Sequence, residues 1–574
     1  MPQASTARWR WLPAEGSWAY HLLLAATGML VLGPLAGVTA AYMNFSLGFF
    51  VGGQVLAGLL GSAVTAGYGV QGKHGANYIQ TAAASVASMS GMGVLVQAMV
   101  WMGLPQPPAW QLVAYFACIG MFGVGVGMLY TPVLVDRLRL AFPSGLAVAN
   151  ILRALTDTAL LKRSVRQLGG GAAAGLLTGL ATTRLAFLGT IELSASTFGA
   201  GMVVGARIGV PAVIGGLIGW ATQPFFVSIG WLAPGDPFRK IMFLVALGTI
   251  MGAALVDLAL IFWRAWPGAQ RRLAEEPPAD DWRRVHRGRL WLWVLAWGAG
   301  TLATGHLLLR QPLFFLALAI ALVFLFALVN GISVGVSDSN PISSAFVVAV
   351  VVMALLGLAD AGAGLMAGAI LLVSTSVACD MQQDRSTGWR LGTPRVLQFR
   401  YQVLGILVGA VLAVVFARVF MAAYPVLALD QTVMKAGQQP AEWSSAMTYK
   451  FVGVLRSLTD DKPYQRTAIL AGVAIGFAIE VARKLLKPRA FLLDAVLLPS
   501  PYALSFGGFV NLPTSLWLGA GGVVGSLIEA RVPRRDDGLP ADMSRTSLFG
   551  GGLIAGDAIA ALAIGITGLL ATVL

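Results

Sequence analysis

Apolar runs long enough to cross a membrane recur along almost the whole chain. A helix crosses the apolar core of a bilayer with roughly 17–25 residues. Runs of about that length form two series: 19–42, 47–70, 78–103, 111–136, 169–187 and 238–264, then 288–308, 312–331, 342–358, 361–379, 398–424, 467–485 and 546–573. The pattern predicts an all-α polytopic membrane protein with about 13–17 transmembrane helices.

Two further regions, 196–229 and 495–530, are apolar but interrupted by Gly and Pro. Broken backbone is tolerated at membrane depth only where it is buried in protein or lines a cavity. These regions therefore predict broken or re-entrant helices. Two amphipathic segments, 143–160 and 441–460, carry too much charge for spans that face lipid.

The two amphipathic segments contain near-copies of one motif, NILRALTD at 150–157 and GVLRSLTD at 453–460. A duplication within a polytopic membrane protein is typical of secondary transporters, whose halves enclose a central site. Weaker echoes support it, namely Asn44 with Asn340, TFG with SFG, and Asp257 with Asp557. The alternative is chance similarity between helices rich in Ala, Leu and Gly.

Matching the two copies predicts the organisation of the chain. The predicted segments are a cytosolic tail at 1–18, a first repeat at 19–264, a basic loop and linker helix at 265–311, and a second repeat at 312–574. The linker helix has no mate, and one extra crossing between two copies inverts the second copy. The repeats should then be related by an axis in the membrane plane.

Composition agrees with a membrane protein and narrows the partners. Of 574 residues, 57% are hydrophobic and 11% charged, with a mean hydropathy of +0.76. The net charge of +14 comes from loop residues that set topology, so it does not indicate nucleic acid. It places the N-terminus and the loops 264–290, 380–397 and 531–545 in the cytosol. Two Cys in apolar runs and four His far apart predict no disulfide framework and no metal site.

Polar residues beside broken or apolar segments are candidates for substrate binding. Short polar side chains next to irregular backbone can hold a zwitterionic or chelated ligand, although a surface turn has the same composition. The candidates are Asp338 and Asn340 with their repeat mates Tyr42 and Asn44, together with Asn77, Gln80, Asn330 and Asn511.

Carboxylates and duplicated ion pairs are candidates for proton coupling or gating. Asp380 and Asp384 would share a helix face, where two close carboxylates suit a proton relay, or they would join a cytosolic charge cluster. Asp257 and Asp557 lie inside apolar spans, where a carboxylate is costly and is either functional or a cap. The i,i+4 pairs Arg153/Asp157 and Arg456/Asp460 are either gates at the two ends of a pathway or plain helix-stabilising pairs.

One segment carries a family resemblance. Residues 378–395, ACDMQQDRSTGWRLGTPR, resemble a segment of the oligopeptide transporter (OPT) family of the type D-x-x-x-D-x-[KR]-T-G followed by P-R. The matching positions are Asp380, Asp384, Thr387, Gly388, Pro394 and Arg395, with Ser386 where Lys is common. Segments 142–149, 199–208, 329–341 and 552–559 agree with further family motifs, in order. The N-P-G and K-I-P-P-R motifs of large eukaryotic members were not found, so the chain looks closer to the bacterial and Yellow Stripe-Like branch.

The resemblance implies a secondary transporter in the bacterial inner membrane. Its partners would be the lipid bilayer, protons and a small-molecule substrate, either an oligopeptide or a metal chelate, taken up by alternating access. The family is compatible with a homodimer, and no cofactor is expected. The alternatives are an intramembrane enzyme or a channel. Ile554 replaces the first Gly of the G-x-G-D motif that an aspartyl protease needs, and no filter repeat is found.

Overall fold

The computed structural model describes residues 12–46, 54–140, 142–156, 158–182, 185, 187, 191, 193–265, 281–337, 340, 342–434, 443, 445–457, 463–486, 490–531 and 544–573. All regular secondary structure in these ranges is helical. Seven helical segments there are long and apolar enough to cross a membrane. They confirm an all-α polytopic membrane protein.

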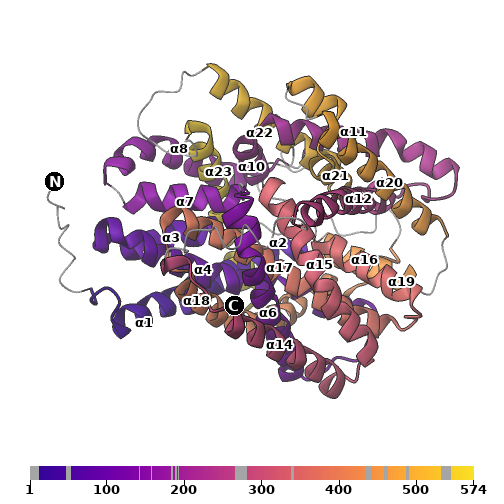
Figure 1. Ribbon diagram of the computed structural model, residues 1–574, viewed down its shortest axis with the longest axis horizontal. Helices are drawn as coiled ribbons and strands as arrows, with labels where there is room; N and C mark the ends of the chain where they lie inside the picture. Colours follow the sequence, from indigo (N-terminus) through magenta and orange to yellow (C-terminus); the bar gives the residue numbers. More distant parts are fainter. Residues whose placement is uncertain are drawn as a thin grey trace. The chain divides into compact units, whose positions relative to one another are not determined.

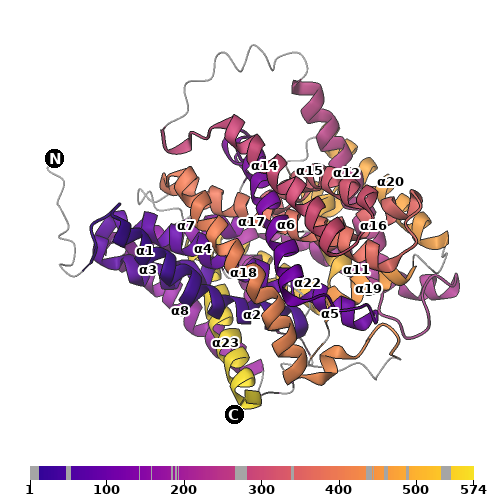
Figure 2. The same ribbon diagram turned by 90° about the horizontal axis from the view of Figure 1, so that it is seen from below.

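The chain divides into two compact units. Unit 1 comprises Met1–Gly170, Val285–Asp460 and Ala555–Leu574. Its helices are α1 (Trp18–Ala26), α2 (Gly33–Ser46), α3 (Gln54–Thr65), α4 (Gly72–Gly91), α5 (Val94–Trp101), α6 (Ala109–Thr131), α7 (Pro143–Thr156), α14 (Arg287–Ala303), α15 (Leu313–Ser337), α16 (Ile342–Leu355), α17 (Ala361–Leu391), α18 (Arg395–Ala423) and α19 (Ala446–Ser457) (Figures 1 and 2). Short 3-10 or π turns lie at Thr27–Leu32, Ala66–Gln71, Pro132–Arg137, Thr304–Leu308 and Pro425–Ala428.

Unit 2 comprises Gly171–Arg284 and Asp461–Ile554. Its helices are α10 (Ala195–Val204), α11 (Ala206–Ser228), α12 (Arg239–Ala265), α20 (Pro463–Leu486), α21 (Pro501–Phe509) and α22 (Leu512–Arg531), with short turns at Asp281–Arg283 and Leu493–Leu497. Two helices run from one unit into the other, α8 (Thr158–Thr182) and α23 (Arg545–Val573).

Helices are broken where the sequence predicts it. In the region 196–229, α10 has 10 residues, and Gly205 then takes a φ of 78° before α11 begins. In the region 495–530, α21 has 9 residues and is followed at once by α22. Helices of that length are too short to cross a bilayer. Each broken region is thus a short helix joined to a longer one.

The order and packing of the helices show the duplication. The helices from α1 to α12 are matched in order by those from α15 to α23, with α1 and α2 together matching α15 and α4 and α5 together matching α17. Helix α14 is the unmatched linker. Neighbours repeat as well. Helix α18 packs on α4 as α6 packs on α17, α2 packs on α4 as α15 packs on α17, and α10 packs on α22 as α21 packs on α11. The two related repeats are therefore confirmed, whereas the predicted segment boundaries stay predictions.

Backbone contacts cross between the copies at equivalent positions. Phe142 and Ser445, which precede α7 and α19, both take left-handed conformations, with φ of 44° and 39°. The amide of Phe142 donates to the carbonyl of Gly335 at 2.9 Å, and that of Ser445 donates to the carbonyl of Phe45 at 3.0 Å. Residues other than Gly rarely adopt this conformation, so its recurrence at matching positions indicates shared ancestry.

Equivalent helices lie antiparallel within each unit. In unit 1, Gln80 contacts Asp384 and Ser88 contacts Asp380, so the chain runs in opposite directions along α4 and α17. In unit 2, the glycines of α11 meet those of α22 in opposite order, with Gly209 beside Gly519 and Gly205 beside Gly522. Antiparallel equivalents are related by an axis perpendicular to the helices, which is the geometry of an inverted repeat.

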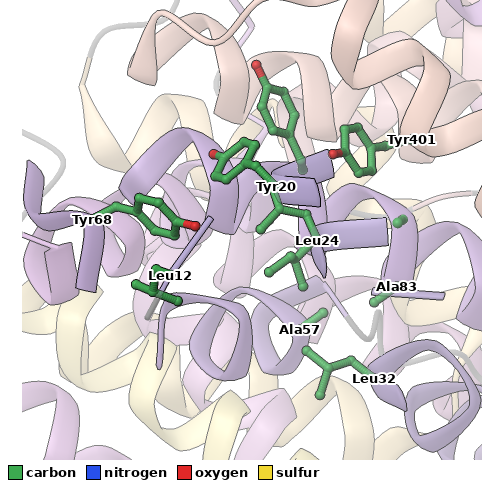
Figure 3. Packing of buried hydrophobic residues seen from close by; sticks show 11 residues of the cluster. Leu12, Tyr20, Leu24, Leu32, Ala57, Tyr68, Ala83 and Tyr401 are labelled. Carbon is green, nitrogen blue, oxygen red and sulfur yellow. The ribbon is translucent and has the colours of Figure 1, made fainter. Parts of the chain in front are cut away.

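An aromatic cluster holds the first helices of unit 1. Tyr20 of α1 packs edge-on against Tyr68, with ring centroids 5.2 Å apart, and Tyr78 of α4 stacks on Tyr401 of α18 at 5.0 Å. Figure 3 shows Tyr20, Tyr68 and Tyr401 around the buried Leu24. These contacts fix α1 and α18 against α4, the helix that supplies one side of the site described next.

Candidate functional site

Helix α17 carries the two carboxylates of the family-like segment. Asp360 caps its first turn by accepting from the amide of Ala363 at 2.6 Å, and Gly392, with φ of 73°, ends it after 31 residues. The sequence predicted a span at 361–379 followed by a cytosolic loop at 380–397. The prediction of a loop there is wrong, because the helix continues to Leu391 and its polar C-terminal half is buried. Asp380 and Asp384 therefore lie one helical turn apart inside the protein.

The two carboxylates face polar side chains of α4. Gln80 Nε2 donates to Asp384 Oδ1 at 2.6 Å, and Ser88 Oγ donates to Asp380 Oδ2. The hydroxyl of Ser88 is in turn 3.3 Å from that of Ser376 on α17. Asp384 and Gln80 are 1% and 0% exposed, so water does not screen these contacts.

Helix α18 completes this polar cluster. Gln398 Nε2 donates to the backbone carbonyl of Asp384 at 2.8 Å and to Thr81 Oγ1 at 2.9 Å. Asn77 Oδ1 is 3.5 Å from the same nitrogen. A side chain at Gly388 would place its Cβ 2.7 Å from Gln398 Oε1, so the glycine gives Gln398 its room. The three helices lie side by side in both views (Figures 1 and 2).

The cluster presents buried polar atoms that bind nothing else in the part of the chain that the structure describes. A buried polar atom without a partner costs about 1–3 kcal/mol. In the cluster these atoms are Asn77 Nδ2, Gln80 Oε1, Asp384 Oδ2 and Gln398 Oε1. Further such atoms on α17 and α18 are the three guanidinium nitrogens of Arg385, Gln402 Oε1 and both amide atoms of Gln382, which lies against Gly331 of α15. Such a set is unfavourable in an empty core and suits a site whose ligand brings donors and acceptors.

Separate family-like segments meet at this cluster. Thr387 Oγ1 donates to the carbonyl of Gly145 at 2.8 Å, and a Cβ on Gly145 would lie 2.6 Å from the carbonyl oxygen of Gln383. Arg395 forms a two-pronged ion pair with Asp136, at 2.7 and 3.0 Å. The motif positions Thr387 and Gly145 therefore hold α17 against α7, and Arg395 holds α18 against the turn Pro132–Arg137 that follows α6. These contacts explain the residue types without a role in binding.

The other substrate candidates in unit 1 lie on neighbouring helices. Asn44 is buried on α2, where its Nδ2 donates to the carbonyl of Gly91 at 2.9 Å. Tyr42 packs edge-on against Trp443, with ring centroids 5.5 Å apart. Asn330 is buried on α15, and Asn340 is half-buried between α15 and α16. Asp338 lies outside the described residues. The structure brings together Asn77 and Gln80 with the carboxylates, and the binding roles of the others stay predictions.

The duplicated arginines form equivalent contacts across the copies. Arg153 of α7 donates to the carbonyl of Arg390 at the end of α17. Arg456 of α19 donates to the carbonyl of Trp101 at the end of α5, at 3.5 Å, and forms an ion pair with Asp430. The predicted partners, Asp157 and Asp460, lie outside the described residues. Each arginine thus contacts the last turn of a helix of the other copy, α17 for Arg153 and α5 for Arg456.

The remaining candidates lie outside the cluster. Asn511 accepts from the amide of Thr514 at 3.1 Å and so caps α22 in unit 2. Asp257 falls within α12, although its side chain lies outside the described part of the structure. Asp557 is half-buried on α23. The described residues contain no group of three or more His, Cys, Asp or Glu arranged to hold a metal ion.

Sequence reasoning missed Gln398, Ser88 and Arg385. Gln398 and Ser88 lie in apolar runs where polar residues are ordinary, and Arg385 was assigned to a cytosolic loop. One signal was present, because positions 380–391 continue a helix without any Pro or Gly pair to end it.

An inverted repeat of apolar helices around a buried polar cluster defines the architecture of secondary transporters. The sequence matches the model of the family described as "OPT oligopeptide transporter protein" over residues 24–168 and 289–567, and the chain belongs to that family. It is also 22% identical over 561 residues to a Haemophilus influenzae protein named "Putative oligopeptide transporter", covering 84% of this chain and 85% of that one.

Proposed function

We propose that this chain is a proton-coupled transporter that imports small oligopeptides by alternating access. Family membership supports transport of oligopeptides rather than an enzymatic reaction. The observation that carries the coupling is the pair Asp380 and Asp384, buried on a membrane-spanning helix beside Ser88 and Gln80. Carboxylates inside a membrane are costly and are typical of proton relays.

The unpaired amides of the cluster support a peptide as the ligand. A peptide group offers one donor and one acceptor, and Asn and Gln side chains offer the same pair. Asn77 Nδ2, Gln80 Oε1 and Gln398 Oε1 are buried and bind nothing else among the described residues. Peptide backbone placed there would satisfy both sides. Metal chelates, the second substrate class implied by the resemblance, stay a prediction.

Uptake by reconstituted protein tests the proposal directly. Proteoliposomes should accumulate radiolabelled trialanine when the outside is more acidic than the inside, because protons moving down their gradient drive the peptide inward. The titratable groups that act on the two carboxylates, apart from each other, are Arg385 and Cys379, both on α17. Arg385 in turn lies within electrostatic range of Tyr78 on α4 and Arg395 on α18. Accumulation that ignored a protonophore would contradict proton coupling. A ferric siderophore that competed with the peptide would favour the chelate class.

The positive-inside rule supports the orientation. With the N-terminus and the basic loops 264–290 and 531–545 in the cytosol of a bacterial cell, the segment 425–466 lies outside. We place the protein in the inner membrane on that basis. Dimer formation, which the family permits, stays a prediction.

The crosswise arginine contacts support alternating access. Arg153 and Arg456 tie equivalent ends of α17 and α5 to the opposite copy, and inverted copies present these ends to opposite sides of the membrane. A transporter that opens on one side at a time must release one contact while the other holds. The two arginines are then gates, and Asp157 and Asp460 are their proposed further partners.

Opposite effects of Arg153→Ala and Arg456→Ala are the expected result. Each change removes one tie, so each should favour the state open on its own side, by on the order of 1 kcal/mol for one hydrogen bond. The measurement is thiol labelling of a cysteine at position 340 in a chain without Cys118 and Cys379. Arg166→Ala, which removes an exposed arginine of α8, is the control. Shifts in the same direction would leave the arginines as structural ties only.

A further inference from the structure

Arg385 is a buried cation that contacts no counterion within the part of the chain that the structure describes. Its side chain is 1% exposed and is among the largest fully buried side chains of the protein. None of its three guanidinium nitrogens has a hydrogen-bond partner among the described residues. Five N–H groups of a guanidinium normally find acceptors when it is buried, because its charge is expensive to remove from water.

Arg395 is a second buried arginine, and its contacts are those expected of a guanidinium with a structural role. Arg395 is 4% exposed, and both of its terminal nitrogens contact Asp136, at 2.7 and 3.0 Å. Arg385 lies within electrostatic range of Arg395, Asp384 and Tyr78 but contacts none of them. Asp384 directs one oxygen to Gln80 instead. Arg395 has a carboxylate partner among the described residues and Arg385 does not, which indicates that the partner of Arg385 is a ligand.

We propose that Arg385 binds the carboxylate of the transported substrate. A guanidinium presents two parallel N–H groups that match the two oxygens of a carboxylate, and a pair of this kind would neutralise the buried charge. The C-terminus of an oligopeptide carries such a group. The unpaired atoms of Gln80, Asn77 and Gln398 then lie in the same cluster to receive the adjoining peptide groups. This assignment rests on the proposed peptide transport.

The assignment predicts a preference for anionic substrates that no other contact in the cluster would give. Gln and Asn side chains do not distinguish a carboxylate from an amide strongly, because both offer an acceptor oxygen. A cation does. Losing a hydrogen bond to a charged group should weaken binding on the order of 10–100-fold. Uptake should therefore depend on the terminal carboxylate of the peptide.

The test compares two probes, trialanine and its C-terminal amide, as competitors of labelled trialanine uptake by proteoliposomes of the full chain. In the unchanged protein, the amide should compete about 10–100-fold more weakly. Arg385→Gln should remove most of this difference, and Arg385→Lys should keep part of it. Arg418→Gln, at an exposed arginine of α18 that donates to the carbonyl of Pro107, should leave the preference unchanged.

Thermal unfolding separates binding from a structural role. A neutral residue in place of an unpaired buried charge should raise the Tm of ligand-free protein, and added trialanine should then raise the Tm of Arg385→Gln less than that of the unchanged chain. If Arg385→Gln does not fold, the assignment is overturned, since the guanidinium then has a structural partner.

The outcomes distinguish the two proposals. Equal competition by both probes in the unchanged chain would overturn the role of Arg385 and leave peptide transport standing. A preference for trialanine over its amide that persists in Arg385→Gln would also overturn the role of Arg385 and leave peptide transport standing. Absence of saturable uptake of labelled trialanine would overturn peptide transport, and the assignment of Arg385 with it.

Discussion

Replacing Asp384 by Asn is expected to reduce proton-driven peptide uptake on the order of 10-fold or more, since losing about 1.4 kcal/mol of coupling already has that effect. The substitution keeps the shape of the side chain and the oxygen that accepts from Gln80 Nε2, so the contact at 2.6 Å survives. What it removes is the ability to bind and release a proton. Accumulation against a gradient should fail, whereas exchange of labelled for unlabelled trialanine, which needs no net proton movement, should continue.

Asp281→Asn is the matched control for this prediction. Asp281 is 91% exposed in unit 2 and pairs with Arg284 at 3.0 Å, so its loss removes the same charge without touching the cluster. Measuring accumulation and exchange in the same proteoliposomes distinguishes coupling from folding. If Asp384→Asn left accumulation intact, Asp384 would have no part in coupling and Asp380 alone would have to carry the proton. If exchange were lost too, Asp384 would be required for binding or for the conformational change.

The apolar pattern was enough to predict the helices, because burial in lipid demands long apolar runs whatever their neighbours are. The duplication was predicted from the near-copies NILRALTD and GVLRSLTD. The apolar pattern could not place the end of α17. Positions 380–391 hold six charged or amide residues, a composition that indicates a solvated loop when the sequence is taken alone. Only the packing of α4, α6 and α7 around that half-helix makes it an interior segment.

The candidate site could be predicted only in part for a related reason. Asn77, Gln80, Asp380 and Asp384 were recognised as polar residues at the margins of apolar runs. Their pairing depends on the antiparallel approach of α4 and α17, in which Gln80 meets a residue 304 positions further along the chain. No local pattern encodes such a contact, so the roles of Gln398 and Arg385 emerge only in three dimensions.

The two copies share a fold but not its chemistry. The contacts of Arg153 with Arg390 and of Arg456 with Trp101 make those two carbonyls equivalent. Counting back from them, Asp384 corresponds to Leu95 and Asp380 to Gly91. The carboxylates therefore belong to one copy only. In the proposed mechanism, the symmetric scaffold would alternate between two states, while the proton would bind at a site displaced toward one end of α17.

Substitution of the glycines at the contact between α12 and α20 should have a large effect on the stability of the protein. Helices α12 and α20 of unit 2 cross at two reciprocal glycine pairs, Gly248 and Gly252 against Gly472 and Gly476. A Cβ at Gly252 would overlap the carbonyl oxygen of Val473, and one at Gly476 would overlap the carbonyl oxygen of Thr249. Small residues four apart let helices approach closely in membranes, where packing replaces the hydrophobic effect as the driving force.

Gly476→Ala and Gly252→Ala are therefore expected to lower the Tm in detergent, or to prevent isolation of monodisperse protein, although Ala favours a helix by about 1 kcal/mol over Gly. The cost of overlap with backbone, about 1–3 kcal/mol or more, exceeds that gain because backbone cannot move aside as a flexible side chain can. Gly169→Ala is the control. Gly169 lies within α8 with open space around its Cβ position, so propensity alone should act and the Tm should rise. A rise in all three variants would show that α12 and α20 do not pack through glycine.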